Sequence, residues 1–146
     1  MSGCATLEGL RAFIQPPRFE QASENRSEIR LQGTTGAAVR IWTRVSNPNS
    51  FGLTLGTLRG TLHLEGSRAA TVDFPLGLPL PAQGAELVPI DISVDFRDLR
   101  GLGQTIARAV TRQPIEFELE GTIGVSAGRF GEQTIGPMTW LRGELR

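Results

Sequence analysis

The sequence predicts a two-sheet antiparallel β-sandwich with one α-helix. Apolar and polar residues alternate over several short segments, turn-forming residues separate these segments, and one segment repeats its apolar residues at helical spacing. Strands and helices do not alternate along the chain, so a parallel sheet with crossover helices is not expected. The length of 146 residues fits a single folded domain, which we place at residues 29–146.

Two segments show the strand pattern most clearly. Over residues 114–125 the apolar side chains share one face, namely Ile115, Phe117, Leu119, Ile123 and Val125. The other face carries glutamates at alternate positions, so it should meet water. Over residues 90–97, the inward positions are Ile90, Ile92, Val94 and Phe96.

Weaker alternation predicts further strands, and the pattern begins near Ile29. These segments cover about residues 38–46, 53–65, 68–75 and 134–145. The segment 53–65 is long and contains Gly56 and Gly60, which predict a bulge or bend midway along the strand.

The helix is expected after Asp98, which can cap its first turn. Its apolar positions are Leu99, Leu102, Ile106, Ala109 and Val110, and Pro114 ends it. Glycines in its first turns lower helix propensity, so the helix should be held by docking on the sandwich. We expect Ile106 to be buried between Leu102 and Val110.

Residues 1–28 are expected to form a lipidated N-terminus and a tether. Ser2-Gly3-Cys4 resembles the end of a bacterial lipobox, in which small residues precede a cysteine that receives a diacylglycerol lipid. Met1 stands where the hydrophobic lipobox residue belongs, and we expect a signal peptide in the precursor. Pro16-Pro17 and the polar residues 20–28 suit a connector. The alternative is a cytoplasmic protein in which Cys4 occurs by chance.

Composition excludes several classes of function. Fifteen basic residues balance fifteen acidic ones and are dispersed, which argues against a nucleic-acid partner. Cys4 is the only cysteine and His63 the only histidine, so a metal site built from these residue types is not expected. No acid–base or nucleophile constellation is evident, so the sequence predicts neither catalytic residues nor a cofactor.

The turn Asn47-Pro48-Asn49 follows the predicted strand 38–46. Pro48 fixes its own φ and keeps Asn47 out of helical space, and asparagine amides can bond nearby backbone groups. We therefore interpret these residues as a structural turn, with contact to a ligand as the alternative.

This turn and the order of the segments resemble the water-stress-and-hypersensitive-response (WHy) domain of type 2 late embryogenesis abundant proteins. The resemblance covers about residues 29–145. It implies a fibronectin-type-III-like sandwich with a helix, no enzymatic activity, and a link to desiccation stress. Bacterial members of that family are often secreted or lipid-anchored.

The segment Arg40-Ile41-Trp42-Thr43-Arg44 places Trp42 and its two flanking arginines on one strand face. Guanidinium groups can stack on indole at this spacing, which would stabilise an open sheet face by about 0.5–1 kcal/mol for each contact. The alternative is a contact patch for a protein or glycan.

Two hypotheses for the function follow. The first is a stress-associated, protective or chaperone-like domain, held at the bacterial cell envelope through a lipid on Cys4. The second is a protein–protein interaction module of an envelope assembly. In both, the partners are the membrane and envelope or client proteins.

Overall fold

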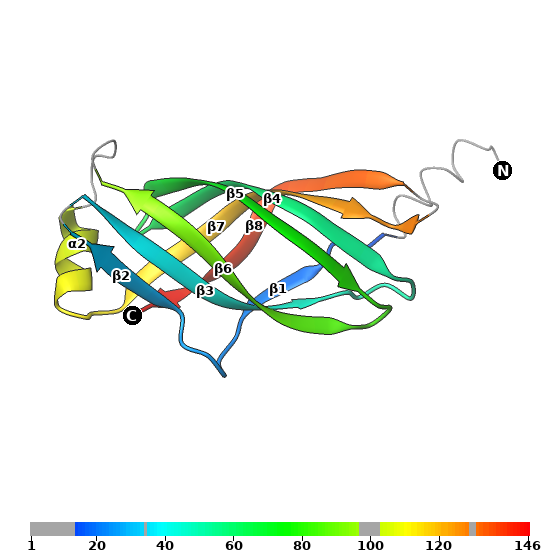
Figure 1. The fold of residues 1–146 in the computed structure, drawn as a ribbon, viewed down its shortest axis with the longest axis horizontal. Coiled ribbons are helices and arrows are strands. Elements are labelled where there is room, and N and C mark those ends of the chain that lie inside the picture. The colour runs from blue at the N-terminus through cyan, green and yellow to red at the C-terminus, as the bar shows by residue number, and fades with distance from the viewer. Residues whose placement is uncertain (1–13, 34, 97–102, 129–130) are drawn as a thin grey trace.

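The computed structural model describes residues 14–33, 35–96, 103–128 and 131–146. Within these ranges the chain forms eight strands and one helix (Figure 1). Their bounds are β1 (Arg18–Gln21), β2 (Glu28–Gln32), β3 (Gly36–Ser46), β4 (Leu53–Leu64), β5 (Ser67–Leu80), β6 (Ala85–Asp95), α2 (Gly103–Val110), β7 (Ile115–Ser126) and β8 (Glu132–Leu145). Several residues on which expectations rest, Cys4, Asp98, Leu99 and Leu102, lie outside the described residues.

The strands build two antiparallel sheets. In sheet A, β3 pairs with β6 along one edge and with β1 and then β2 along the other. Sheet B has the order β5-β4-β7-β8. Figure 1 shows the strands of the two sheets as crossing layers, with α2 at one end of the molecule. The predicted two-sheet antiparallel sandwich with one helix is confirmed.

The core lies between the two sheets and is formed by their alternating inward side chains. In β7, Ile115, Phe117 and Leu119 are buried, as the sequence predicts. The large side chains that are fully buried include Ile41, Leu55, Leu58, Leu62, Ile90, Leu119 and Ile123, which come from both sheets. Burial of apolar surface stabilises by about 25 cal/mol for each Å² removed from water, so this layer is the main source of stability.

The N-terminal segment is more ordered than a tether would be. Residues 18–21, expected in the connector, form β1 and pair with the end of β3. Phe19 is buried and its ring lies 5.3 Å from that of Trp140, centroid to centroid. Ile14 also joins the core. Four residues with polar neighbours give too short a pattern to indicate a strand, so tertiary contacts decide the structure here.

The described part of the helix presents a different face to the sandwich from the one that the sequence predicts. It spans Gly103–Val110 and contacts β2 and β7. Thr105 is buried, whereas Ile106 is half-buried and Val110 is 64% exposed. The expected burial of Ile106 against Val110 is therefore wrong. A two-turn helix docked at the end of a sandwich buries only a narrow stripe, and Val110 lies beyond it.

Strand β4 contains the irregularities that its glycines predict. Its pairing with β5 shifts register between Leu55 and Thr57 and again between Leu62 and His63. Further along, Gly60 lies opposite Gly121 of β7. The two backbones approach so closely that a Cβ on Gly60 would lie 1.8 Å from the carbonyl oxygen of Glu120.

The side chain of Gln21 joins the two sheets at one edge of the sandwich, through hydrogen bonds to the backbone of β8. The Gln21 side-chain amide donates to the carbonyl oxygen of Glu144 at 2.7 Å, and its oxygen accepts from the backbone N–H of Glu144 at 3.3 Å. Gln21 thereby joins β1 of sheet A to β8 of sheet B.

Within the described residues, no helix has the length and apolar character needed to cross a membrane.

Candidate contact surface and the Asn-Pro-Asn turn

Strand β3 presents Arg40, Trp42 and Arg44 on the outer face of sheet A. The residues between them, Ile41 and Thr43, point inward and are buried. Trp42 is half-buried in the middle of the face. The structure therefore brings these three residues together, as the period of the strand predicts.

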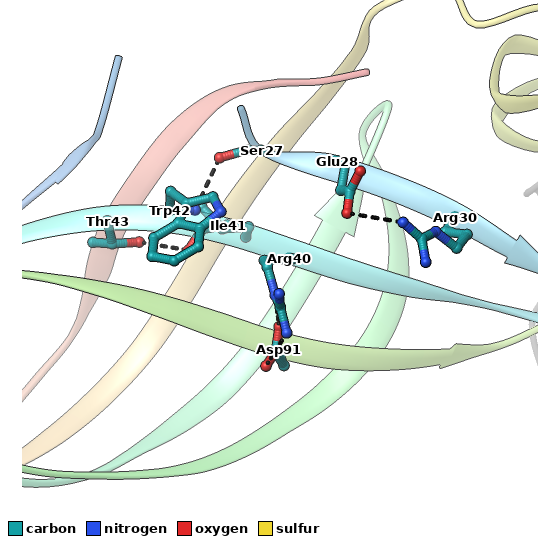
Figure 2. Close-up of polar contacts among 8 residues, drawn as sticks. All are labelled: Ser27, Glu28, Arg30, Arg40, Ile41, Trp42, Thr43 and Asp91. Carbon is teal, nitrogen blue, oxygen red and sulfur yellow. Dashed lines mark hydrogen bonds and ion pairs between the residues drawn. The ribbon is translucent and has the colours of Figure 1, made fainter. Parts of the chain in front are cut away.

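Arg40 forms an ion pair with Asp91 on β6, the strand that pairs with β3 (Figure 2). Its Nε donates to Asp91 Oδ1 at 2.7 Å and its second guanidinium nitrogen donates to Oδ2 at 3.2 Å. These hydrogen bonds raise the pKa of Arg40 above its ordinary value. Glu28 lies opposite Arg40 on the other side, in β2, and binds Arg30.

Arg44 pairs with Glu24, at 2.5 Å between guanidinium nitrogen and carboxylate oxygen. This hydrogen bond lowers the pKa of Glu24 below its ordinary value. Both arginines thus bind carboxylates. Their stacking on the indole of Trp42 stays a prediction of the sequence.

The backbone of Trp42 holds the loop 22–27 between β1 and β2. Its N–H donates to the Ser27 hydroxyl at 2.9 Å (Figure 2). Its carbonyl oxygen accepts from the N–H of Ala22 at 2.8 Å. The Ser27 side chain replaces the strand partner that is missing where β1 ends and β2 has not begun. These two hydrogen bonds therefore fix the loop 22–27 to strand β3.

Two apolar residues of β6 complete this face. Pro89 lies opposite Trp42, and Leu87 lies opposite Arg44. Residues directly opposite each other in an antiparallel pair share a face. We call this set the Trp42 surface; its members are Arg40, Trp42, Arg44, Leu87, Pro89 and Asp91. It is a small apolar centre framed by ion pairs.

The side chain of Asn47 binds backbone groups from two turns. Its amide nitrogen donates to the carbonyl oxygens of Phe51 at 2.8 Å, Pro81 at 3.1 Å and Leu80 at 3.3 Å. Its amide oxygen accepts from the backbone N–H of Asn49 at 2.9 Å. Asn47 is buried, so these bonds are shielded from water.

Asn49 extends this connection to the N-terminal segment. Its side-chain oxygen accepts from the N–H of Gln15 at 2.7 Å, and its amide nitrogen donates to the Gln15 carbonyl at 2.9 Å. Gln83 donates to the Pro48 carbonyl oxygen at 3.0 Å. The turn thus ties together the start of the described chain, the β3–β4 connection and the β5–β6 connection.

Sequence reasoning missed Gln15, Gln83 and Gly84 as partners of this turn. Gly84 accepts a hydrogen bond from the Asn47 N–H through its carbonyl oxygen, at 2.9 Å. Most of these contacts engage backbone groups, which every residue carries, so residue identity gives no signal for them. Cys4, the predicted lipid site, lies outside the described residues.

His63 lies on the outer face of sheet B, where its Nε2 is 2.9 Å from a carboxylate oxygen of Glu120. Among the residues described, no group of three or more histidines, cysteines, aspartates and glutamates is placed to hold a metal ion.

The architecture and the buried asparagine turn define a β-sandwich in which two connections and the N-terminal segment are hydrogen-bonded to one another. A family model for late embryogenesis abundant proteins matches residues 43–139, which include the whole Asn-Pro-Asn turn, strands β4 to β7 and the first half of β8. The chain therefore belongs to the late embryogenesis abundant family, a stress-associated class of proteins.

Solved structures show the same fold. One is the solution structure of an Arabidopsis thaliana protein, 18% identical, with a TM-score of 0.58 over 84% of this chain and 78% of that one. Another is the solution structure of a late embryogenesis abundant (LEA) protein, also 18% identical, with a TM-score of 0.51 over 97% and 79% of the two chains. No curated protein sequence matches the chain.

Proposed function

We propose that this protein is a non-enzymatic protective domain of the WHy type, which keeps denaturing proteins apart during drying or freezing. The observation that best supports this role is that the polar side chains of its two candidate sites are bound to other groups of the protein. At the Trp42 surface the guanidinium groups bind neighbouring carboxylates, and at the Asn-Pro-Asn turn the amides bind the backbone. These groups hold the fold together and are not left free for a reaction.

Protection of this kind needs a fold that survives the stress and a surface that stays hydrated. Acidic and basic residues are equal in number here, and the ion pairs lie at the surface. Interspersed charges of both signs create no large field of one sign, so the surface does not hold a charged client protein tightly. Such a domain separates client molecules by occupying the space between them.

The test is recovery of a labile reporter enzyme after freeze–thaw. Single substitutions Arg40→Ala, Trp42→Ala and Arg44→Ala should leave protection nearly intact, because it does not depend on one patch. Circular dichroism confirms that each variant is folded. A folded Trp42→Ala protein that no longer protects would contradict the proposal, because interface energy concentrates in a few Trp, Tyr and Arg residues.

We further propose that a lipid on Cys4 anchors the protein to the bacterial cell envelope. The support is the lipobox-like Ser2-Gly3-Cys4 sequence. The precursor with its signal peptide should incorporate labelled palmitate in a bacterial host. Cys4→Ala should abolish the label and release the protein in soluble form. Undiminished labelling of Cys4→Ala would contradict the anchor and favour the cytoplasmic alternative.

The Trp42 surface favours a second candidate, an interaction module of an envelope assembly. A half-buried tryptophan beside Leu87 and Pro89, framed by ion pairs, has the composition of a small binding hot spot. Purification of the lipidated protein from native envelope distinguishes the two functions. A stoichiometric partner that is lost in Trp42→Ala would place this candidate first.

A further inference from the structure

The outer face of sheet B carries a trough at the end of the molecule away from α2. It lies over β4, β7 and β8 and has a volume of about 550 Å³. We define the trough by Gly56, Thr57, Thr122, Gly124, Ser126 and Thr134. Small-molecule sites have volumes of about 300–1,000 Å³, so the trough has the capacity of one.

Irregular pairing in three neighbouring ladders surrounds the trough. Register shifts occur between Leu55 and Thr57 in the β4–β5 pair, between Leu55 and Leu58 in the β4–β7 pair, and between Gly121 and Ile123 in the β7–β8 pair. Bulges bend a strand locally and redirect its side chains, and they occur often beside functional sites. Three of the register shifts in sheet B thus lie beside the trough.

The floor of the trough consists of two glycines on neighbouring strands, and the fold does not require glycine at Gly124. Neither Gly56 nor Gly124 has a positive φ, unlike Gly121 with φ of 148°. A Cβ on Gly124 would lie 4.0 Å from its nearest neighbour, the nitrogen of Thr57. Glycine weakens a strand interior, and a ligand that approaches the backbone closely is one reason for its presence.

The walls of the trough carry hydroxyl and amide groups that are not used by the fold. In the part of the chain that the structure describes, the side chains of Thr57, Thr122, Ser126, Gln133 and Thr134 make no hydrogen bond to another protein group. This contrasts with the Trp42 surface, where Arg40 and Arg44 are paired. Each hydroxyl can both donate and accept, so the walls match a ligand that is itself rich in hydroxyl groups.

We propose that this trough binds a neutral saccharide. Its charged lining residues are Arg59 and Glu132, one of each sign, and Arg59 already lies 3.8 Å from a carboxylate oxygen of Asp73. Because these two charges are opposite in sign, the trough favours neither an anion nor a cation. Aromatic residues are absent from the lining that the structure describes, so a flat apolar ligand is disfavoured. A sugar ring can rest its C–H groups on the glycine floor and bond the walls through its hydroxyls. This inference is independent of the protective role.

The test is a titration followed by amide chemical shifts in ¹⁵N NMR, with maltose as a free disaccharide and soluble dextran as a polymer. The amide signals of Gly56, Thr57, Gly124 and Thr134 should change position as saccharide is added. We expect a Kd for the saccharide of about 1 mM, because the trough is open. Gly124→Val fills the floor and should weaken binding at least tenfold. The pair Thr122→Val and Thr134→Val keeps the shape, removes two hydroxyls and should weaken binding as strongly.

Thr61→Val is the matched control, since Thr61 lies on the same face of β4 outside the trough. It should leave the affinity unchanged. If dextran binds more tightly than maltose, the natural ligand is a glycan chain. If maltose binds and dextran does not, the natural ligand is a free sugar. The proposal is overturned if neither saccharide moves these amides, or if Gly124→Val and the double valine variant, both folded, bind as the wild type does. It is also overturned if sodium phosphate moves the amides and the saccharides do not.

Discussion

Asn47 makes more side-chain contacts to the backbone than any other residue of the turn, and these contacts join the β3–β4 connection to the β5–β6 connection. Its amide nitrogen binds carbonyl oxygens of Phe51, Leu80 and Pro81, and its oxygen binds the N–H of Asn49. An isolated hydrogen bond contributes about 1 kcal/mol, but buried groups left without a partner cost about 1–3 kcal/mol each. A single side chain can therefore control the stability of two turns.

We expect Asn47→Ala to lower the free energy of unfolding by about 2–3 kcal/mol, because it leaves buried carbonyl oxygens and one N–H without a partner. Urea denaturation of the purified protein measures this change. The matched control is Asn25→Ala in the loop 22–27, which should change stability by less than about 0.5 kcal/mol. If the two substitutions lowered the free energy of unfolding equally, the hydrogen bonds of Asn47 would not stabilise the turn as described.

The pair of Arg44 and Glu24 gives a prediction for pH. The hydrogen bond from Arg44 lowers the pKa of Glu24 below its ordinary value in the folded protein. The pair therefore stabilises the fold at pH values above the ordinary pKa of a glutamate, and this contribution is lost as the pH falls through the lower pKa of the folded state. Carboxyl ¹³C NMR should show the Glu24 pKa rising toward its ordinary value in Arg44→Gln. An unchanged pKa in that variant would contradict the pairing.

At the scale of elements, the contact between β4 and β7 is the most demanding in sheet B. Gly60 and Gly121 face each other, and a Cβ on either would lie 2.0 Å or less from a backbone carbonyl oxygen of the other strand. Backbone atoms in the middle of a sheet cannot move aside cheaply. The two strands can therefore pair closely only because both positions are glycine.

We expect Gly60→Ala to destabilise the protein by about 3 kcal/mol or more, since it forces the central ladder of sheet B apart. Gly103→Ala in α2 is the control, because a Cβ there meets nothing within 4 Å. It should raise stability by up to about 1 kcal/mol through better helix propensity. Thermal unfolding of the two variants checks both signs, and a Gly60→Ala protein as stable as the wild type would contradict the close approach.

The elements differ in how far the sequence predicts them, for physical reasons. Strands β6 and β7 alternate over many residues, so their inward faces are predicted correctly down to Ile90 and Leu119. The short β1 and the docking face of α2 depend on contacts made elsewhere in the chain, and no local pattern encodes those contacts. The candidate residues Arg40, Trp42 and Arg44 are placed on one face by period, but their partners Asp91 and Glu24 come from other elements and are not predictable by spacing.

On the scale of the whole molecule, the two outer faces differ in kind. Sheet A presents the Trp42 surface, where ion pairs engage the arginines, and sheet B presents the trough, whose hydroxyl groups make no hydrogen bond to other described residues. Between the faces, the core and the Asn-Pro-Asn turn tie the connections together. The proposed protective function rests on this stability and not on either face.

The most direct test of the proposed function compares the wild-type protein with an unrelated β-sandwich domain at equal mass. A labile reporter enzyme is dried or frozen with each, and its remaining activity is measured on recovery. The account predicts that the wild type preserves more reporter activity than the control domain, because its function is to keep denaturing proteins apart. Equal recovery with the two domains would contradict the protective function and place the envelope-interaction function first.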